Sequence, residues 1–213
     1  MIDPYYLQQL TIGISLGMVY ALMAIGFTLI FGVLNVVNFA HGEVYTIGAF
    51  AGIMAIAAFG PPFLVIVFIV LAVGALAGFS LERVAFRPFR RFSDEASLKS
   101  RAMREATLMS SLAMSIIARE AMELLFGSEF QTIDISYLIN KPIEFGPVTI
   151  VNGDIIIFVV SVLMLGGLQW LLKYSSIGLS IRAVSNNPLG AKYVGINTDR
   201  TIVLTFVIGS MMG

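Results

Sequence analysis

The sequence contains no cysteine and only one histidine. Disulfide bonds and thiolate chemistry are therefore excluded, and a single histidine cannot form a His-rich metal site. Charged residues are also scarce, at 12% of the chain, whereas 58% of the residues are hydrophobic and the mean hydropathy is +0.91. Ordinary soluble domains carry about 25% charged residues. The composition therefore predicts a membrane protein.

Two long segments, Pro4 to Gly42 and Val44 to Leu81, contain no Asp, Glu, Lys or Arg. Because about 20 apolar residues cross a bilayer, the first segment holds one span and the second holds two. The predicted transmembrane helices are Leu7 to Leu34, Val44 to Phe59, Pro62 to Leu81, Thr107 to Phe126, Ile155 to Leu172, and a last one that begins at Thr201. The predicted fold class is all-α: residues 1–213 form a single domain, a polytopic transmembrane helical bundle of about six spans.

The charged residues predict the orientation of the bundle. The loop 83–104 holds seven basic residues against two acidic ones, and the segment 173–200 around the loop 174–199 holds four against one. Cytoplasmic loops carry an excess of Lys and Arg, so both loops are predicted to be cytoplasmic. The loop 127–154 holds four acidic residues and one basic residue and is predicted to lie outside, as is the N-terminus.

The sequence ends 13 residues after Arg200. At 1.5 Å per residue these residues are too few to cross a hydrocarbon core of ~30 Å. We therefore expect the last span to be incomplete and the chain to be truncated at its C-terminus, with a re-entrant end as the alternative.

Four predicted spans contain two glycines one helical turn apart. The pairs are Gly13 with Gly17, Gly48 with Gly52, Gly74 with Gly78, and Gly209 with Gly213. Small residues at this spacing let helix backbones approach closely inside a bilayer. Four such pairs predict a tightly packed bundle rather than independent anchors.

A cluster of polar residues, "NVVNFAHGE", follows the first span and includes the only histidine. Asn35, Asn38 and His41 recur every three residues and would share one face of a helix. Polar groups next to a span tend to face a cavity or the bundle interior. They therefore line a substrate path or, in the alternative interpretation, the asparagines cap the first helix and the segment to Gly42 is an interfacial turn.

A second segment, "GLSIRAVSNNPLGAKYVGIN", predicts a helix, a break and a short second helix. Asn187 is suited to cap the short helix, Pro188 to its first position and Gly195 to a left-handed stop. The sequence leaves open whether this helix docks a partner or only connects two spans.

Charged side chains interrupt the fourth predicted span at Arg119, Glu120 and Glu123. Arg119 and Glu123 are one turn apart and can form an intramembrane pair. The alternative is that these side chains extend toward lipid headgroups at the outer end of the helix.

The runs from Gly13 to Phe50 and from Ser175 to Ser210 resemble permease subunits of branched-chain amino-acid ABC importers, of the LivH type. The resemblance extends over essentially the whole chain. It implies a multi-pass protein of the bacterial plasma (inner) membrane, and family members are longer by roughly two spans. It also implies four kinds of partner: a second homologous permease, two cytoplasmic ATP-binding subunits, a periplasmic or extracellular solute-binding protein, and the lipid bilayer.

The resemblance also implies roles for residues in both segments. ATPase coupling would fall on Arg182, Ala183, Asn187, Pro188, Ala191, Gly195 and Ile196. The acidic residue that many relatives have near Asn187 to Gly190 is missing here, which puts a salt bridge to the ATPase in doubt. The translocation pathway would include Asn35, Asn38, His41 and Gly42.

The chain has no Gly-x-x-x-x-Gly-Lys-Ser/Thr sequence, so it lacks its own ATP-binding loop. We expect no enzymatic activity, cofactor, metal or nucleic-acid partner. The predicted function is a permease subunit of an ATP-driven importer for branched-chain or other hydrophobic amino acids. The close alternative is a related importer of urea or short-chain amides, and the distant ones are a membrane enzyme and a passive channel.

Overall fold

The computed structural model describes the chain except residues 1–3, 61, 92–100, 130–142, 146–147 and 151. The helices are α1 (Pro4–Leu34), α2 (His41–Phe59), α3 (Phe63–Leu81), η1 (Glu82–Phe86), α4 (Arg87–Arg91), α5 (Arg101–Phe126), α6 (Asn152–Tyr174), α7 (Ser176–Asn186), α8 (Pro188–Tyr193) and α9 (Thr198–Met212). The strands β1 (Ile143–Phe145) and β2 (Val148–Ile150) form an antiparallel hairpin. The predicted helical bundle is confirmed, and the hairpin is an element that the sequence did not predict.

Each predicted span coincides with a helix, and four of these are long and apolar enough to cross a membrane. They are Tyr5–Leu34, His41–Phe59, Phe63–Phe89 and Gly153–Tyr174. The helix α5 is long enough but more polar, and α9 has only 15 residues. The described chain is therefore a multi-pass membrane protein.

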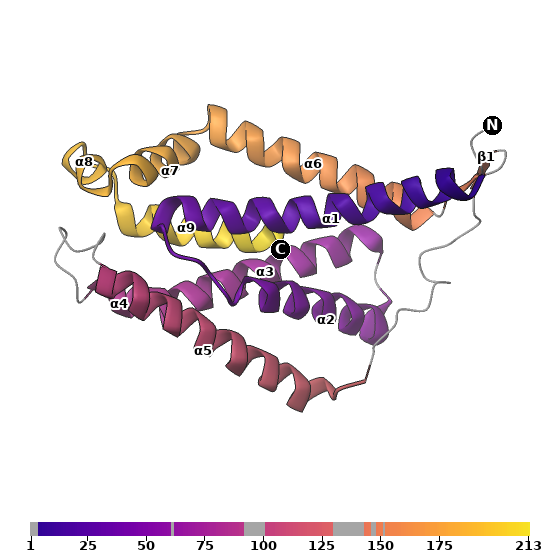
Figure 1. The fold of residues 1–213 in the computed structure, drawn as a ribbon, viewed down its shortest axis with the longest axis horizontal. Coiled ribbons are helices and arrows are strands. Elements are labelled where there is room, and N and C mark those ends of the chain that lie inside the picture. The colour runs from indigo at the N-terminus through magenta and orange to yellow at the C-terminus, as the bar shows by residue number, and fades with distance from the viewer. Residues whose placement is uncertain (1–3, 61, 92–100, 130–142, 146–147, 151) are drawn as a thin grey trace.

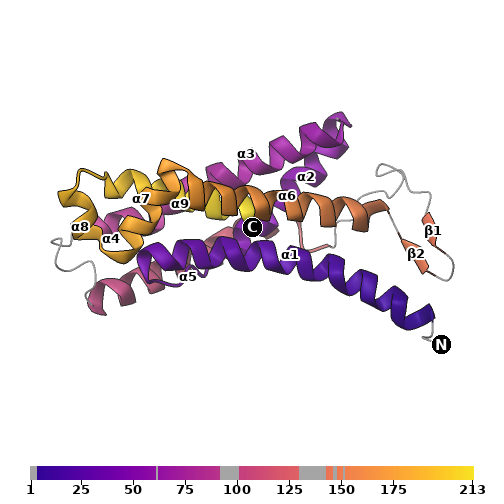
Figure 2. The same cartoon turned by 90° about the horizontal axis from the view of Figure 1, so that it is seen from above.

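The helices lie roughly along one common direction (Figure 1). The central helices α1 and α9 lie side by side, with α6 on one flank and α3 and α2 on the other, and α5 is outermost. The short helices α4, α7 and α8 gather at one end of the bundle, and the N-terminus and hairpin lie at the other in both views (Figure 2). The helices α4, α7 and α8, which belong to the two basic segments, thus lie at the same end of the bundle, while residues 92–100 of the first segment lie outside the described residues. Which side is cytoplasmic stays a prediction.

The predicted basic loop is shorter than expected on its N-terminal side. The helix α3 continues without a break into η1, one turn of π-helix, and then into α4, which ends at Arg91. Phe86 of η1 is fully buried, and its ring packs against Phe206 of α9 at 4.6 Å between centroids. Because this aromatic contact lies beyond the apolar run of α3, the helix is extended into the basic segment by packing against α9.

Glycines let α9 contact α1 through the backbone. A Cβ atom added at Gly209 would lie 2.8 Å from the carbonyl oxygen of Gly26 and 2.8 Å from Ile30 Cγ1. No side chain fits between the two backbones there, so the contact requires both glycines.

The opposite side of α9 packs on α3 in the same way. A Cβ atom at Gly74 would lie 2.9 Å from the carbonyl oxygen of Ser210, and one at Gly78 would lie 2.7 Å from that of Phe206. The pair Gly48 and Gly52 on α2 packs less tightly, against Val70 of α3. Three of the four glycine pairs thus lie at helix contacts, as the sequence predicted.

The first glycine pair, Gly13 and Gly17, does not lie at a helix contact. Within the described structure, a Cβ atom at Gly13 or Gly17 would meet nothing within 4 Å.

This difference between the glycine pairs gives a matched pair of substitutions. Gly209→Ala should destabilise the bundle by about 1–3 kcal/mol, the usual cost of overpacking, whereas Gly13→Ala should not. The comparison is the midpoint of thermal unfolding in detergent, and equal midpoints for the two variants would contradict the backbone contact.

Candidate functional site

The helix α1 ends at an asparagine in a left-handed conformation. Asn35 has φ 53°, and its N–H donates to the carbonyl oxygen of Phe31 at 2.7 Å. Among the described residues other than glycine, it alone has a positive φ. Asparagine tolerates this conformation better than most residues, and it often ends helices in this way. Asn35 is exposed and terminates α1, as the alternative interpretation of the sequence has it.

Asn38 and His41 lie elsewhere, in the protein interior. Each side chain is only 2% exposed. Residues 35–40 are not helical, so their three-residue spacing does not place Asn35 on the same face as the other two. The Oδ1 atom of Asn38 accepts the N–H of Ala40 at 3.2 Å, which shapes the turn before α2.

The imidazole of His41 lies between α1, α2 and the end of α9. It packs against the ring of Phe27 at 6.0 Å between centroids, and a Cβ atom on Gly213 would lie 3.1 Å from its Nε2. The backbone of Met23 is the polar neighbour of the imidazole, but neither ring nitrogen forms a hydrogen bond of normal geometry with a described residue, and neither does Nδ2 of Asn38. Gly42 is next to this pair and half-buried. A buried polar group without a hydrogen bond costs about 1–3 kcal/mol. A polar ligand that bonded to these atoms would remove this cost, so they are candidates for ligand contacts.

Serines of α5 hold the turn in place, and the sequence analysis missed them. The buried Ser111 hydroxyl accepts the N–H of Phe39 at 3.4 Å, and its single proton is shared between the carbonyl oxygens of Leu108 at 2.9 Å and Val37 at 3.3 Å. One turn further on, the Ser115 hydroxyl donates to Glu43 Oε1 at 3.3 Å. The available signal was the four-residue spacing of Ser111 and Ser115, which places both hydroxyls on one face of α5.

The second predicted segment folds as its sequence indicates. The Asn187 side chain caps α8 by accepting the N–H of Gly190 at 3.0 Å, and Pro188 occupies the first helical position. Gly195 has φ 84° and follows the helix. The N–H of Ile196 donates to the carbonyl of Ala191, which closes the last turn. The predicted helix, break and short helix are thereby confirmed.

The residues assigned to ATPase coupling divide into exposed and buried groups. Arg182, Asn187 and Gly195 are exposed, and Pro188 is half-buried. Ala191 is only 4% exposed, and Ala183 and Ile196 pack against the same core. A partner cannot reach Ala191 in this structure, because α8 uses that face to pack on the bundle.

The surface of α8 instead presents two large residues that the sequence analysis did not single out. Tyr193 is 87% exposed and Val194 is 75% exposed. Tyr193 follows Ala191 by two positions, which on a helix places it on another face, and Val194 is the residue that follows the end of α8. Both side chains are therefore open to contact with another molecule at this end of the bundle.

Arg119 and Glu123 lie one turn apart on α5, and both side chains are exposed on the described bundle, as is Glu120. The structure therefore places them on its outer surface rather than in its interior. Their pairing stays a prediction. Within the described part of the chain, no group of three or more His, Cys, Asp or Glu side chains is placed to hold a metal ion.

A bundle of apolar helices that encloses polar side chains such as Asn38 and His41, and that carries a capped short helix at one end, is consistent with a membrane permease. Residues 9–213 match the family described as "Branched-chain amino acid transport system / permease component". The chain belongs to this family.

Curated relatives are similar over almost the whole chain. The chain is 36% identical to "High-affinity branched-chain amino acid transport system permease protein LivH" of Escherichia coli (strain K12) and 34% identical to the protein of the same name from Salmonella typhimurium. It is 36% identical to the permease protein BraD of Pseudomonas aeruginosa. Each alignment covers 98% of this chain and 68% of the relative. No solved structure matches the chain.

The left-handed backbone at Asn35 can be tested with two substitutions. Asn35→Gly should leave the stability unchanged, whereas Asn35→Val should lower it by about 1–2 kcal/mol, because a β-branched residue is strained at positive φ. The measurement is the unfolding midpoint in detergent. A valine variant as stable as the glycine variant would contradict the conformation of the turn.

Proposed function

We propose that the chain is a permease subunit of an ATP-driven importer of branched-chain or other hydrophobic amino acids. It forms half of a translocation pathway with a second, homologous permease. Two cytoplasmic ATP-binding subunits supply the energy, and a solute-binding protein delivers the cargo. The observation that carries the proposal is a chain of contacts from α8 to the polar turn that contains Asn38 and His41.

The first contact in this chain fixes α8 to the bundle. Ala191 of α8 belongs to one buried cluster with Val184 of α7 and with Ile202 and Phe206 of α9. The short helix therefore cannot move independently of α7 and α9, since displacing it would open a cavity in this cluster.

The second contact joins α7 to the end of α1. The Ser185 hydroxyl donates to the carbonyl oxygen of Gly32 at 2.6 Å. Gly32 lies three positions before Asn35, where α1 ends and the turn begins. A displacement of α8 by an ATPase is thus transmitted through α7 to the turn, whose other side Ser111 holds to α5. Closure of the two ATPases would then expose the pathway alternately to either side.

The pathway in this proposal includes Asn38, His41 and Gly42. Asn38 and His41 supply donors and acceptors without a fixed charge, which suits a zwitterionic amino acid. Asn35 instead shapes the end of α1. The printed names of the relatives favour branched-chain amino acids over urea or short-chain amides as cargo. Uptake of labelled leucine into cells that lack their own system, with and without excess urea or valine, tests this choice: competition by urea alone would overturn it.

Docking of the ATPase is assigned to the exposed surface of α8. Tyr193→Glu should weaken co-purification of the ATP-binding subunit about tenfold or more, because central aromatic residues dominate such contacts. Tyr174→Glu is the matched control, since Tyr174 is similarly exposed but lies at the end of α6. Undiminished co-purification with Tyr193→Glu would argue against α8 as the docking site.

A pathway role of His41 differs from a structural role in its effect on stability. His41→Leu should keep or raise the unfolding midpoint, because the buried imidazole forms no hydrogen bond of normal geometry with a described residue. Uptake should fall about tenfold for one lost hydrogen bond of ~1.5 kcal/mol to the cargo. Phe27→Leu, a comparable change in the adjacent ring, should retain uptake. If the His41→Leu protein transports normally, His41 is not part of the pathway.

A further inference from the structure

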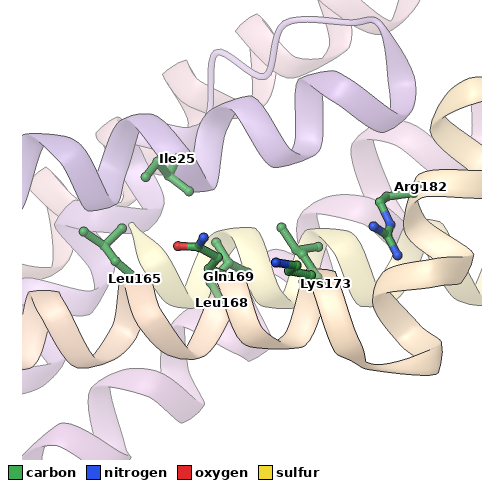
Figure 3. Close-up of a pocket in the computed structure, with 7 residues that line it drawn as sticks. Ile25, Leu165, Leu168, Gln169, Lys173 and Arg182 are labelled. Carbon is green, nitrogen blue, oxygen red and sulfur yellow. The ribbon is translucent and has the colours of Figure 1, made fainter.

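A groove of about 450 Å³ lies between α1, α6 and α7, away from the polar turn. Its lining combines an apolar wall with three polar side chains, Gln169, Lys173 and Arg182. In Figure 3, Ile25 extends from α1 toward α6, and Arg182 extends from α7 toward the end of α6 that carries Lys173. The volume is in the range of ordinary ligand pockets.

The apolar wall runs along the helix axis. Besides Ile25, it is made by Leu165, Leu168 and Leu172. These leucines recur at three- and four-residue spacing and so form one stripe on α6. A long apolar stripe between helices that cross a membrane matches an acyl chain rather than a compact solute.

Aromatic residues beside the polar rim indicate that it lies near the membrane–water interface. Trp170 and Tyr174 next to it on α6 are both exposed, and aromatic residues of this kind are enriched at interfaces. The Nζ of Lys173 lies 5.2 Å from the centre of the Tyr174 ring. The two cationic groups of the groove are thus placed where phospholipid headgroups lie.

Apart from Asp154 in the first turn of α6, at the opposite end of that helix from Lys173, the elements that form the groove contain no carboxylate to neutralise these cations. Residues 4–42, which include all of α1, contain no Asp or Glu. Residues 155–198 contain none either, and they cover α6 beyond its first turn and all of α7. A lysine and an arginine around one groove without an acid are complementary to a phosphate group.

We propose that this groove binds one anionic phospholipid, with its phosphate between Lys173 and Arg182 and an acyl chain along the leucines of α6. Gln169 is placed to donate to the ester or glycerol oxygens. The family resemblance assigned Arg182 to the ATPase contact, and this proposal assigns it to lipid binding instead. The lipid would join α7 to α1 and α6, and the proposal does not depend on the cargo or on the ATPase.

The test is native mass spectrometry of the full chain purified with equal amounts of phosphatidylglycerol and phosphatidylcholine. The wild-type protein should retain phosphatidylglycerol preferentially. Arg182→Gln and Lys173→Gln should each lower the ratio of the two bound lipids about fivefold, the effect of one basic group near an anionic surface. Arg200→Gln is the matched control, because Arg200 is also exposed but is not part of the groove lining.

A second variant separates a lipid from a free phosphate. Ile25→Trp fills the apolar wall, keeps both cations and should abolish the preference. An unfolding midpoint near that of the wild type shows that the variant is folded. The proposal is overturned if both lipids bind equally, if Arg200→Gln has the same effect as Arg182→Gln, or if the folded Ile25→Trp protein retains its preference.

Discussion

The direct backbone contact of α9 with α1 on one side and with α3 on the other is the constraint on which the bundle depends. In a membrane, helices gain little from burying apolar side chains against each other, because lipid is equally apolar. Close approach of backbones gives them dispersion contacts that lipid cannot replace. At Gly26 with Gly209, and at Gly74 and Gly78 with the backbone of α9, a single added carbon has no room.

This central contact also determines where polar groups are buried. Since α9 lies against α1, its end reaches the imidazole of His41, and the side chain is enclosed between three helices. The Ser210 hydroxyl on the same helix is likewise buried without a hydrogen-bond partner among the described residues. Tight packing and available polar atoms therefore occur together. The tight packing holds these polar atoms in fixed positions, which reduces the entropy lost when a solute binds.

The sequence predicted well those features that depend on neighbouring residues. The cap at Asn187, the proline after it and the stop at Gly195 each follow from local backbone chemistry, and each is present. The helical positions of the spans follow from apolar length, and the glycine pairs follow from their spacing. Gly13 and Gly17 are the exception, because spacing alone does not say which helix face meets a neighbour.

Features that depend on distant residues were not predictable from spacing. Asn35, Asn38 and His41 are evenly spaced in the sequence, but the left-handed conformation of Asn35 ends α1. The side chain of Asn35 is therefore exposed, whereas those of Asn38 and His41 are buried. The burial of Ala191 results from the position of α9, and local sequence does not contain that information. For the same reason the serines of α5 acquire their importance only once α5 lies beside the turn.

The glycine contacts of α9 constrain the chain in a way that no single substitution reveals. One residue inserted between Thr198 and Gly209 would turn the rest of the helix by about 100° and advance it by 1.5 Å. Ile208 would then take the place of Gly209 against Gly26 of α1, and Met212 would take the place of Gly213 beside His41. The spacing between the start of α9 and its glycines is therefore as fixed as their identity, and changes of length in this part of the protein belong in the connections that precede Thr198.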